Sequence, residues 1–342
     1  MKRCPLATPL WLSAYLAFFL LFYPSSTGVA SSGRTAGEAE AGWRTDWTGR
    51  HDRARPPLTW SARENIRWKI PLEQWSNATP VLWKNRVFFC EEPSTVICAD
   101  TGKAEILWKA DVNYEEFVDQ SELRAAGKEQ ARMREVQTRR TRLSQKVNSL
   151  NAQFRSSGKK KELLTPLREA QQELNRVNAE LRKLQVKSKS GRKPPTHATN
   201  GYSSPTPVIA GGKLYVLFGY GAAAAFDMEG NRIWARMVER STNGWGHSAS
   251  PVLTDGKLIL HINRSVYALD PDSGEELWKA ASSSTWGTPL PLRMGRERAV
   301  LTTGGDIIRC RDGKVVATKV GVMPWTSPIE HERVIYIVDQ NG

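Results

Sequence analysis

The sequence predicts an all-β fold, a β-propeller of four-stranded blades, interrupted by one inserted pair of helices. Three observations carry this prediction. A Thr/Ser-Pro element recurs along the chain, an element running from Asp to Trp recurs beside it, and the stretch 113–198 switches to heptad spacing. The net charge of +14 is concentrated in that same stretch, which sets it apart from the repeats.

The Thr/Ser-Pro element opens each predicted blade. Its later copies are separated by 44, 38 and 39 residues, and one more copy precedes them; the prolines are Pro80, Pro207, Pro251, Pro289 and Pro328. Leu258, Leu260 and Ile262 alternate with other residues, which predicts a half-buried strand, and Asp-Gly pairs supply tight turns. A period near 40 with four short strands per copy is typical of propeller blades. A β-sandwich with coincidental prolines is the alternative.

The second element closes each blade and spans 8, 7 and 8 residues from Asp to Trp. In the third copy it reads Ala268-x-Asp270-x-x-x-Gly274-x-x-x-Trp278, which resembles the tryptophan-docking motif of the pyrroloquinoline-quinone-like (PQQ-like) propellers. That superfamily includes quinoprotein alcohol dehydrogenases and the outer-membrane assembly factor B lipoproteins. The resemblance implies that each Trp lies flat against a neighbouring blade, where its N–H needs an acceptor. The predicted docking residues are Asp100, Trp108, Asp227, Trp234, Ala268, Asp270, Gly274 and Trp278.

Some copies depart from the motif. The turn after Asp227 is one residue short, Gly102 comes two residues early, and the copy ending in Gly313 has no Trp. The expected order is a signal peptide (1–30), a flexible leader with a Trp-rich segment (31–59), blade 1 (60–112), the helical insertion with its linker (113–198) and blades 2 to 5 (199–342). Because such propellers usually close with more blades, we expect an open arc of four to five blades in a C-terminally truncated chain.

The N-terminus has the pattern of a secretory signal. Lys2 and Arg3 precede a mostly apolar run over 10–23, too short for a comfortable membrane span, and Gly28-Val29-Ala30 offers small residues for cleavage. This predicts a periplasmic or extracellular protein, with an uncleaved N-terminal anchor as the alternative. The segment 43–50 resembles a weakened opening element of secreted PQQ-like propellers, and we expect an irregular segment whose two Trp pack on the sheet. Cys90 and Cys98 form either a disulfide across a hairpin or buried free thiols.

The insertion at 113–198 predicts an antiparallel coiled-coil hairpin. Apolar residues recur at spacings of three and four on both sides of Ser156-Ser157-Gly158. From Ser121 to Lys193 there are 20 Lys and Arg against 7 Asp and Glu, a net +13. Such a basic arm fits anionic lipid, acidic polysaccharide or an acidic partner protein, or it is a solvated helix surface. We expect no nucleic-acid partner, because the signal directs the protein away from it.

Aromatic residues gather just before the Thr/Ser-Pro elements, where superposed blades would place them around one mouth of the channel. The candidate binding residues are Trp75, Tyr202, Trp245, His247, Trp286 and Trp325. Aromatic walls with a few polar groups suit a small ligand or a peptide. Packing between blades is the alternative for the aromatic rings, and a structural role is the alternative for His247.

The sequence shows no phosphate loop, no metal-ligand spacing and no nucleophile elbow, so no catalytic or metal-binding residue is predicted. The predicted function is that of an extracytoplasmic, non-catalytic scaffold that binds a protein partner, a ligand or an envelope component, in cell-envelope assembly. The alternative is a PQQ-dependent oxidoreductase whose catalytic residues lie in missing blades. No cofactor is predicted, and PQQ and calcium belong to that alternative alone.

Overall fold

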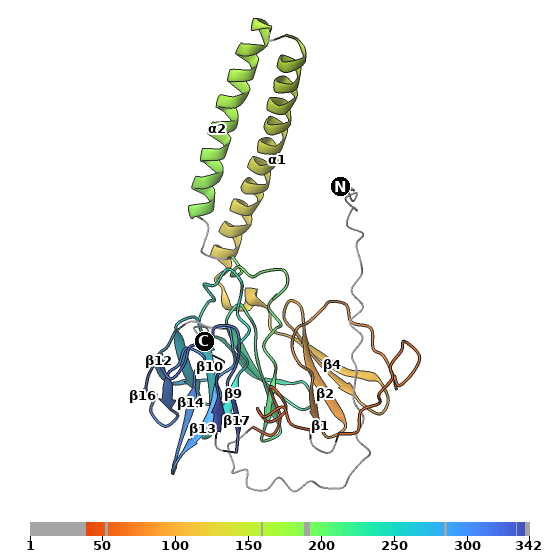
Figure 1. Cartoon of the computed structure of the whole chain (residues 1–342), viewed down its shortest axis with the longest axis vertical. Coiled ribbons are helices and arrows are strands. Elements are labelled where there is room, and N and C mark those ends of the chain that lie inside the picture. Colours follow the sequence, from red (N-terminus) through yellow and green to blue (C-terminus); the bar gives the residue numbers. More distant parts are fainter. Residues whose placement is uncertain are drawn as a thin grey trace, which may run out of the picture. The chain divides into compact units, whose positions relative to one another are not determined.

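The computed structural model describes residues 39–51, 54–158, 160–187, 192–283, 286–332 and 334–338. The predicted signal peptide therefore lies outside the described residues. The chain forms two compact units: a helical unit, Tyr114–Lys193, and a propeller unit made of the residues before and after it. The described part of the propeller unit contains four antiparallel sheets of four strands and one sheet of two strands (Figure 1).

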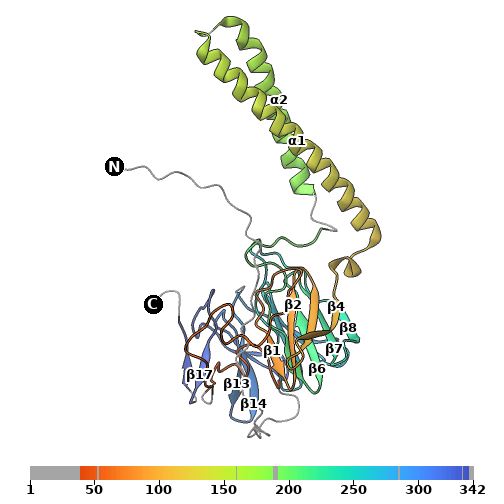
Figure 2. The ribbon, with the colours of Figure 1, turned by 90° about the vertical axis from the view of Figure 1, so that its right-hand side faces the viewer.

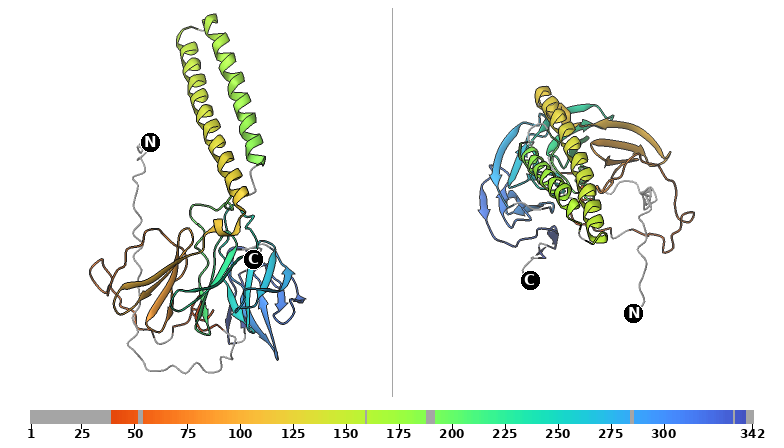
Figure 3. Two further views of the ribbon diagram at one scale, coloured as in Figure 1. Left: turned by 180° about the vertical axis from the view of Figure 1, so that it is seen from behind. Right: turned by 90° about the horizontal axis from the view of Figure 1, so that it is seen from above.

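Each sheet is one blade whose strands lie in chain order. The strands of blades 1 and 2 are β1 (Val81–Trp83), β2 (Arg86–Glu91), β3 (Thr95–Asp100), β4 (Glu105–Asp111), β5 (Val208–Ala210), β6 (Lys213–Leu217), β7 (Ala222–Asp227) and β8 (Arg232–Met237). Those of blades 3 to 5 are β9 (Val252–Thr254), β10 (Lys257–Ile262), β11 (Ser265–Leu269), β12 (Glu276–Ala281), β13 (Leu290–Met294), β14 (Glu297–Leu301), β15 (Ile307–Arg309), β16 (Val315–Ala317), β17 (Ile329–His331) and β18 (Val334–Tyr336). The blades follow one another along an arc (Figures 2 and 3).

The blades are buried on both faces near the axis, which the alternation of Leu258, Leu260 and Ile262 did not predict. These three residues are fully buried, and so is Ile259 between them. The prediction of a strand is confirmed, but the prediction of half-burial is wrong. A blade packs between two neighbours, so both faces of its inner strands lose contact with water, whereas the outer strands β4 and β12 are largely exposed.

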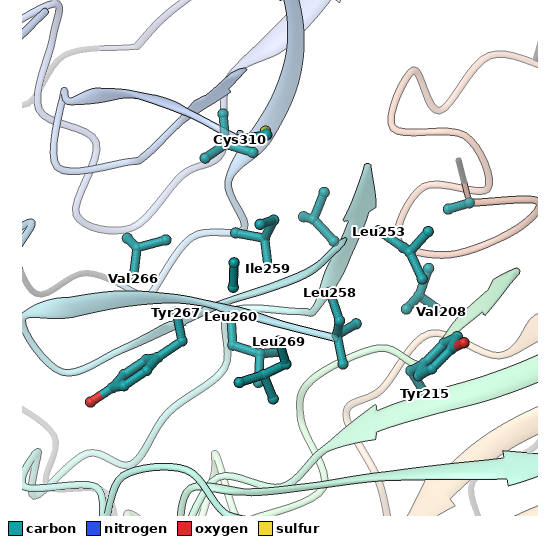
Figure 4. Close-up of a cluster of buried hydrophobic side chains, with 14 of the residues drawn as sticks. Val208, Tyr215, Leu253, Leu258, Ile259, Leu260, Val266, Tyr267, Leu269 and Cys310 are labelled. Carbon is teal, nitrogen blue, oxygen red and sulfur yellow. The ribbon is translucent and has the colours of Figure 1, made fainter. Parts of the chain in front are cut away.

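One cluster of apolar side chains joins blades 2, 3 and 4. Figure 4 shows Val208 and Tyr215 of blade 2, Leu253 to Leu269 of blade 3 and Cys310 of blade 4 within it. Each fully buried aliphatic or aromatic side chain of this kind contributes about 1.5–3 kcal/mol relative to the exposed side chain. The stability of the unit therefore arises mainly between blades, as in other repeat proteins.

On the outside, tryptophans join neighbouring blades. Their indole N–H groups donate to backbone carbonyls of the next blade's turn: Trp108 to Met228 at 2.9 Å, Trp234 to Pro271 at 2.9 Å and Trp278 to Cys310 at 2.7 Å. Trp68 makes the same bond to Thr101 in blade 1, at 2.8 Å. Each docked indole thus satisfies its donor on the neighbour, as the motif implies.

A residue with positive φ receives each of these rings. An added Cβ would stand 2.7 Å from the ring of Trp108 at Gly230, of Trp234 at Gly274 and of Trp278 at Gly313, with φ of +91°, +75° and +72°. Only glycine combines this backbone conformation with so close an approach. In blade 1 the equivalent residue, four before Trp108, is Ala104 with φ of +61°. The early Gly102 of the sequence is therefore not the docking residue of that blade.

The helical unit is an antiparallel pair, α1 (Gln120–Ser156) and α2 (Leu164–Lys187). The short 3-10 helix η1 (Tyr114–Phe117) precedes α1, and a second one, η2 (Lys161–Leu163), lies between the two helices. Asp119 caps α1 by accepting from Ser121 N at 2.7 Å. Val136, Val177 and Leu184 form the buried seam, with Met133, Leu143 and Leu181 packed against it. The predicted helical hairpin is confirmed; supercoiling of its helices stays a prediction.

Three cysteines lie in the described residues, and all are buried free thiols. Cys90 pairs with Val96 and Cys98 with Phe88 across the β2–β3 hairpin, so the two thiols do not face each other. Burial raises the pKa of Cys98 to about 12. Within the described part of the chain, no helix combines the length and the hydropathy that crossing a membrane requires.

Candidate functional site: the mouth of the propeller

The six predicted site residues all lie in segments that lead into the first strand of a blade. Trp75 precedes β1, Tyr202 precedes β5, Trp245 and His247 precede β9, Trp286 precedes β13, and Trp325 precedes β17. We call this end of the propeller unit the mouth. The prediction that these residues bind a ligand remains a prediction.

A ladder of hydroxyl groups ties the mouth segments together. In blades 2 to 5, the Thr or Ser before the recurring proline accepts a hydrogen bond through its side-chain hydroxyl. The donor is the backbone N–H of the equivalent Thr or Ser in the preceding blade. These bonds run from Thr79 to Thr206 (3.1 Å), from Thr206 to Ser250 (3.0 Å), from Ser250 to Thr288 (3.0 Å) and from Thr288 to Ser327 (2.9 Å). The ladder crosses four blade interfaces and gives the mouth a fixed backbone. The recurrence of Thr or Ser before proline was its signal in the sequence.

Trp75 and Tyr202 pack between blades 1 and 2. Glu92, in the β2–β3 turn, accepts from Tyr202 N at 2.6 Å and from Ser203 N at 2.5 Å. The Trp75 ring comes within 2.8 Å of where a side chain at Gly201 would begin. Tyr202 donates its hydroxyl to Pro194 O at 2.6 Å. These two aromatic residues are held by neighbouring protein groups.

The other aromatic residues of the mouth reach water. Trp286 and Trp325 stack with ring centroids 4.5 Å apart and an angle of 10° between the ring planes. Trp325 is 69% exposed. Trp245 is 57% exposed and stacks on His197 at 4.1 Å. We call Trp245, Trp286 and Trp325 the tryptophan rim. Stacking holds these rings in fixed orientations while leaving indole surface free for contact.

His247 is buried, and a second buried imidazole, His261 of β10, disfavours the charged form of His247. Burial lowers the pKa of His247 to about 3, with His261 adding to the shift, and burial lowers the pKa of His261 to about 4. Both rings are therefore neutral near pH 7. His261 was not predicted from the sequence, because the residue lies inside an apolar strand.

The carboxylates near the mouth are engaged in structural bonds. Glu91 accepts from Gln74 N at 2.6 Å, Glu92 holds the blade 2 lead-in, and Asp306 accepts from Ser282 Oγ at 2.7 Å. Among the described residues, no group of three or more His, Cys, Asp or Glu side chains is arranged to hold a metal ion.

A scan of protein-family models gives no match to this sequence, and a search of curated proteins gives none either. Solved structures give matches at the level of the fold. BamB from Moraxella catarrhalis is 10% identical, with a TM-score of 0.37, over 78% of this chain and 70% of that chain. A quinohemoprotein alcohol dehydrogenase from Comamonas testosteroni is 15% identical, with a TM-score of 0.32, over 61% of this chain.

The chain spans 21% of the length of that dehydrogenase and 30% of a second one, ADHIIG from Pseudomonas putida HK5, which is 13% identical with a TM-score of 0.36 over 71% of this chain. This chain folds as a β-propeller of four-stranded blades with a helical insertion. Four-stranded blades, docked tryptophans and the glycines beneath them carry that assignment.

Proposed function

We propose that this chain is an extracytoplasmic, non-catalytic binding scaffold that holds a protein partner of the cell envelope on its tryptophan rim. The observation that carries the proposal is the Trp286–Trp325 stack, in which the stacked indole of Trp325 is 69% exposed. Covering such a ring removes a large apolar surface from water and immobilises few bonds, since the stack has already fixed its orientation. Tryptophan is accordingly enriched among the residues that dominate binding energy.

The state of the polar groups supports a binding role over a catalytic one. Two buried histidines with lowered pKa values are weak bases near pH 7, whereas an efficient general base has a pKa close to the working pH. Glu92 and Asp306 hold the mouth together through hydrogen bonds. The mouth therefore combines free aromatic surface with polar groups already used by the fold.

Photo-crosslinking in the native host tests the proposal. A photoreactive amino acid at Thr326, which is exposed beside Trp325, should capture a defined partner, and the same probe at the exposed Leu58 should not. With that partner purified, Trp325→Ala should weaken binding at least tenfold. Trp60→Ala, a change outside the mouth, serves as the matched control. Equal losses in both variants, or no loss in either, would reject the rim as the binding surface.

A spectroscopic assay separates this scaffold from the alternative of a quinoprotein oxidoreductase. The purified chain is mixed with PQQ and calcium, desalted, and examined for retained chromophore and for dye reduction with alcohols. The scaffold should retain none and reduce none. Retention at one equivalent per chain would favour the oxidoreductase.

The extracytoplasmic location rests on the predicted signal at residues 1–30. Fractionation of the host followed by N-terminal sequencing of the mature protein checks it. A mature N-terminus close to Ala30 is expected, and recovery of the intact Met1 terminus in the cytoplasmic fraction would contradict the location.

The helical unit extends the scaffold with a basic surface for an anionic envelope component. Its acidic residues Glu173 and Glu180 pair with Arg139 and Arg132, while the stretch 136–161 of the sequence contains no Asp or Glu. Cosedimentation with vesicles rich in anionic phospholipid, at low and high salt, tests this part. Binding that high salt abolishes is expected, and no binding at low salt would exclude lipid as the component.

A further inference from the structure

The chain's own residues 39–50 lie against the innermost strands of the propeller unit, as an added strand would. Glu40 N donates to Ile209 O at 2.7 Å, and Ile209 N donates back to Ala41 O at 2.7 Å, which forms an antiparallel bridge on β5. Ala39 N donates to Leu253 O of β9 at 3.1 Å. Because these are main-chain bonds, they recognise an extended backbone of any sequence.

The side chain of Glu40 adds a charge-specific contact. Its Oε2 accepts from Trp83 Nε1 of blade 1 at 2.7 Å, and its Oε1 accepts from Gly211 N of the β5–β6 turn at 2.8 Å. Hydrogen bonds to an ionised carboxylate are stronger than those between neutral groups. Gly211 lies at the end of blade 2 opposite the mouth, so this contact is separate from the tryptophan rim.

The positions on either side of Glu40 have room only for small residues. Ala39 and Ala41 are 3% and 5% exposed, and a Cβ at Gly42 would stand 3.1 Å from Val208 Cγ2. Trp47, only 7% exposed, joins the apolar cluster of blades 2 to 4. The surface therefore selects a carboxylate between small residues, followed by an indole.

The segment is held in a shape that its own residues do not favour. Three residues of the segment have positive φ: Arg44 (+52°), Thr45 (+65°) and Trp47 (+67°). Residues other than glycine rarely adopt this backbone conformation. Arg44 Nη1 and Trp47 Nε1 are buried without a hydrogen-bond partner among the described residues. The contacts with the propeller unit must outweigh these costs, and a peptide free of them would bind the same surface with less strain.

We propose that the inner face of blades 1 to 3 is a second binding site, for an extended peptide that carries a carboxylate between small residues and an indole beyond them. Residues 39–50 fill this site in cis, and a partner peptide of the same chemistry replaces them. The described part of the connection from residue 51 to Trp68 is largely exposed, so the segment leaves the site without unfolding blade 1. As a tethered competitor, the segment sets the affinity that a partner must exceed.

The test uses the full chain and a labelled, end-capped peptide of residues 39–50. Fluorescence anisotropy is measured on the wild-type chain and on the double variant Glu40→Ala/Trp47→Ala, which loses the carboxylate and indole contacts that the segment makes in cis. The peptide should bind the double variant at least tenfold more tightly than it binds the wild type. A control peptide carrying the same two changes should bind the double variant at least tenfold more weakly than the natural peptide.

Adding Trp83→Phe to the double variant should weaken the natural peptide about tenfold, because phenylalanine lacks the indole donor. Equal binding of natural and control peptides would overturn the proposal. Should the double variant fail to fold, hydrogen exchange of the Glu40 amide is followed in the wild type with excess natural peptide. Faster exchange shows displacement in trans, and unchanged exchange at saturating peptide overturns the proposal.

Discussion

Removing the indole of Trp278 should destabilise the propeller unit by about 3–4 kcal/mol. A large aromatic side chain buries about 150–250 Å² in a core, so this half-buried ring buries on the order of 100 Å², which contributes about 2.5 kcal/mol at ~25 cal/mol per Å². Trp278→Ala also leaves Cys310 O without its donor at 2.7 Å, a loss of about 1 kcal/mol. The total agrees with the usual cost of about 3–5 kcal/mol for removing a core tryptophan.

A double-mutant cycle with Gly313 isolates the docking contact itself. In Gly313→Ala the new Cβ would stand 2.7 Å from Trp278 Cε3, and the backbone φ of +72° adds strain of about 1 kcal/mol. Once Trp278 is replaced by alanine, the clash disappears and only the strain remains. We therefore expect a coupling of about 1–2 kcal/mol between the two substitutions, within the range for residues in contact.

Urea unfolding followed by circular dichroism in the β region measures both costs. Trp60→Ala serves as the control, because Trp60 is 39% exposed and its indole N–H donates to Pro57 O of its own loop. The cost of this change should stay below about 1 kcal/mol. Equal costs for Trp278→Ala and Trp60→Ala would refute the docking argument. So would strictly additive effects of Trp278→Ala and Gly313→Ala.

Three further outcomes are expected. Since folded His247 and His261 have pKa values of about 3 and 4, the free energy of unfolding should fall as the pH drops below about 6.5, the ordinary histidine pKa, and glutamine at both positions should flatten that slope in urea titrations. In the helical unit, Val177→Ala should lower the free energy of unfolding by about 1–2 kcal/mol, measured by thermal unfolding at the helical circular-dichroism signal. The exposed Arg139→Gln should lower it by less than about 1 kcal/mol, and equal losses would contradict the buried seam. Excising residues 118–188 with a short linker should leave the β spectrum and melting of the propeller unit unchanged, and loss of folding would show that the unit needs its insertion.

The blades could be predicted from the sequence because the contacts between them repeat. The Thr/Ser-Pro pairs and the Asp-to-Trp elements recur because each blade meets its neighbour in the same way, so one chain displays several copies of one interaction. The motif is also shared between blades: Gly274 receives Trp234, while Trp278 docks on Gly313. The missing Trp of the fourth copy therefore leaves the interface between blades 3 and 4 intact.

The residues that the sequence did not predict make contacts that occur once. Glu92 meets Tyr202 across 110 positions, and Glu40 meets Gly211 across 171. No local pattern marks a carboxylate as the partner of a backbone N–H so far along the chain. The spacing of the repeats also does not specify which residues surround an aromatic side chain. It therefore did not predict that Trp75 lies between blades or that Trp325 is exposed.

The interface between blades 4 and 5 connects fold and function. Ala317 stands four residues after Gly313, where a docking tryptophan follows Gly230 and Gly274, so blade 4 has no outer tryptophan for blade 5. The two blades are joined instead at the mouth, through the hydroxyl ladder, the bond from Trp286 N to Pro324 O at 3.1 Å, and the Trp286–Trp325 stack. The exposed indole proposed to hold a partner thus also helps to hold blade 5. A partner that binds only the stacked arrangement stabilises the docking of blade 5 by its own binding free energy, about 2.7 kcal/mol at a hundredfold excess over Kd.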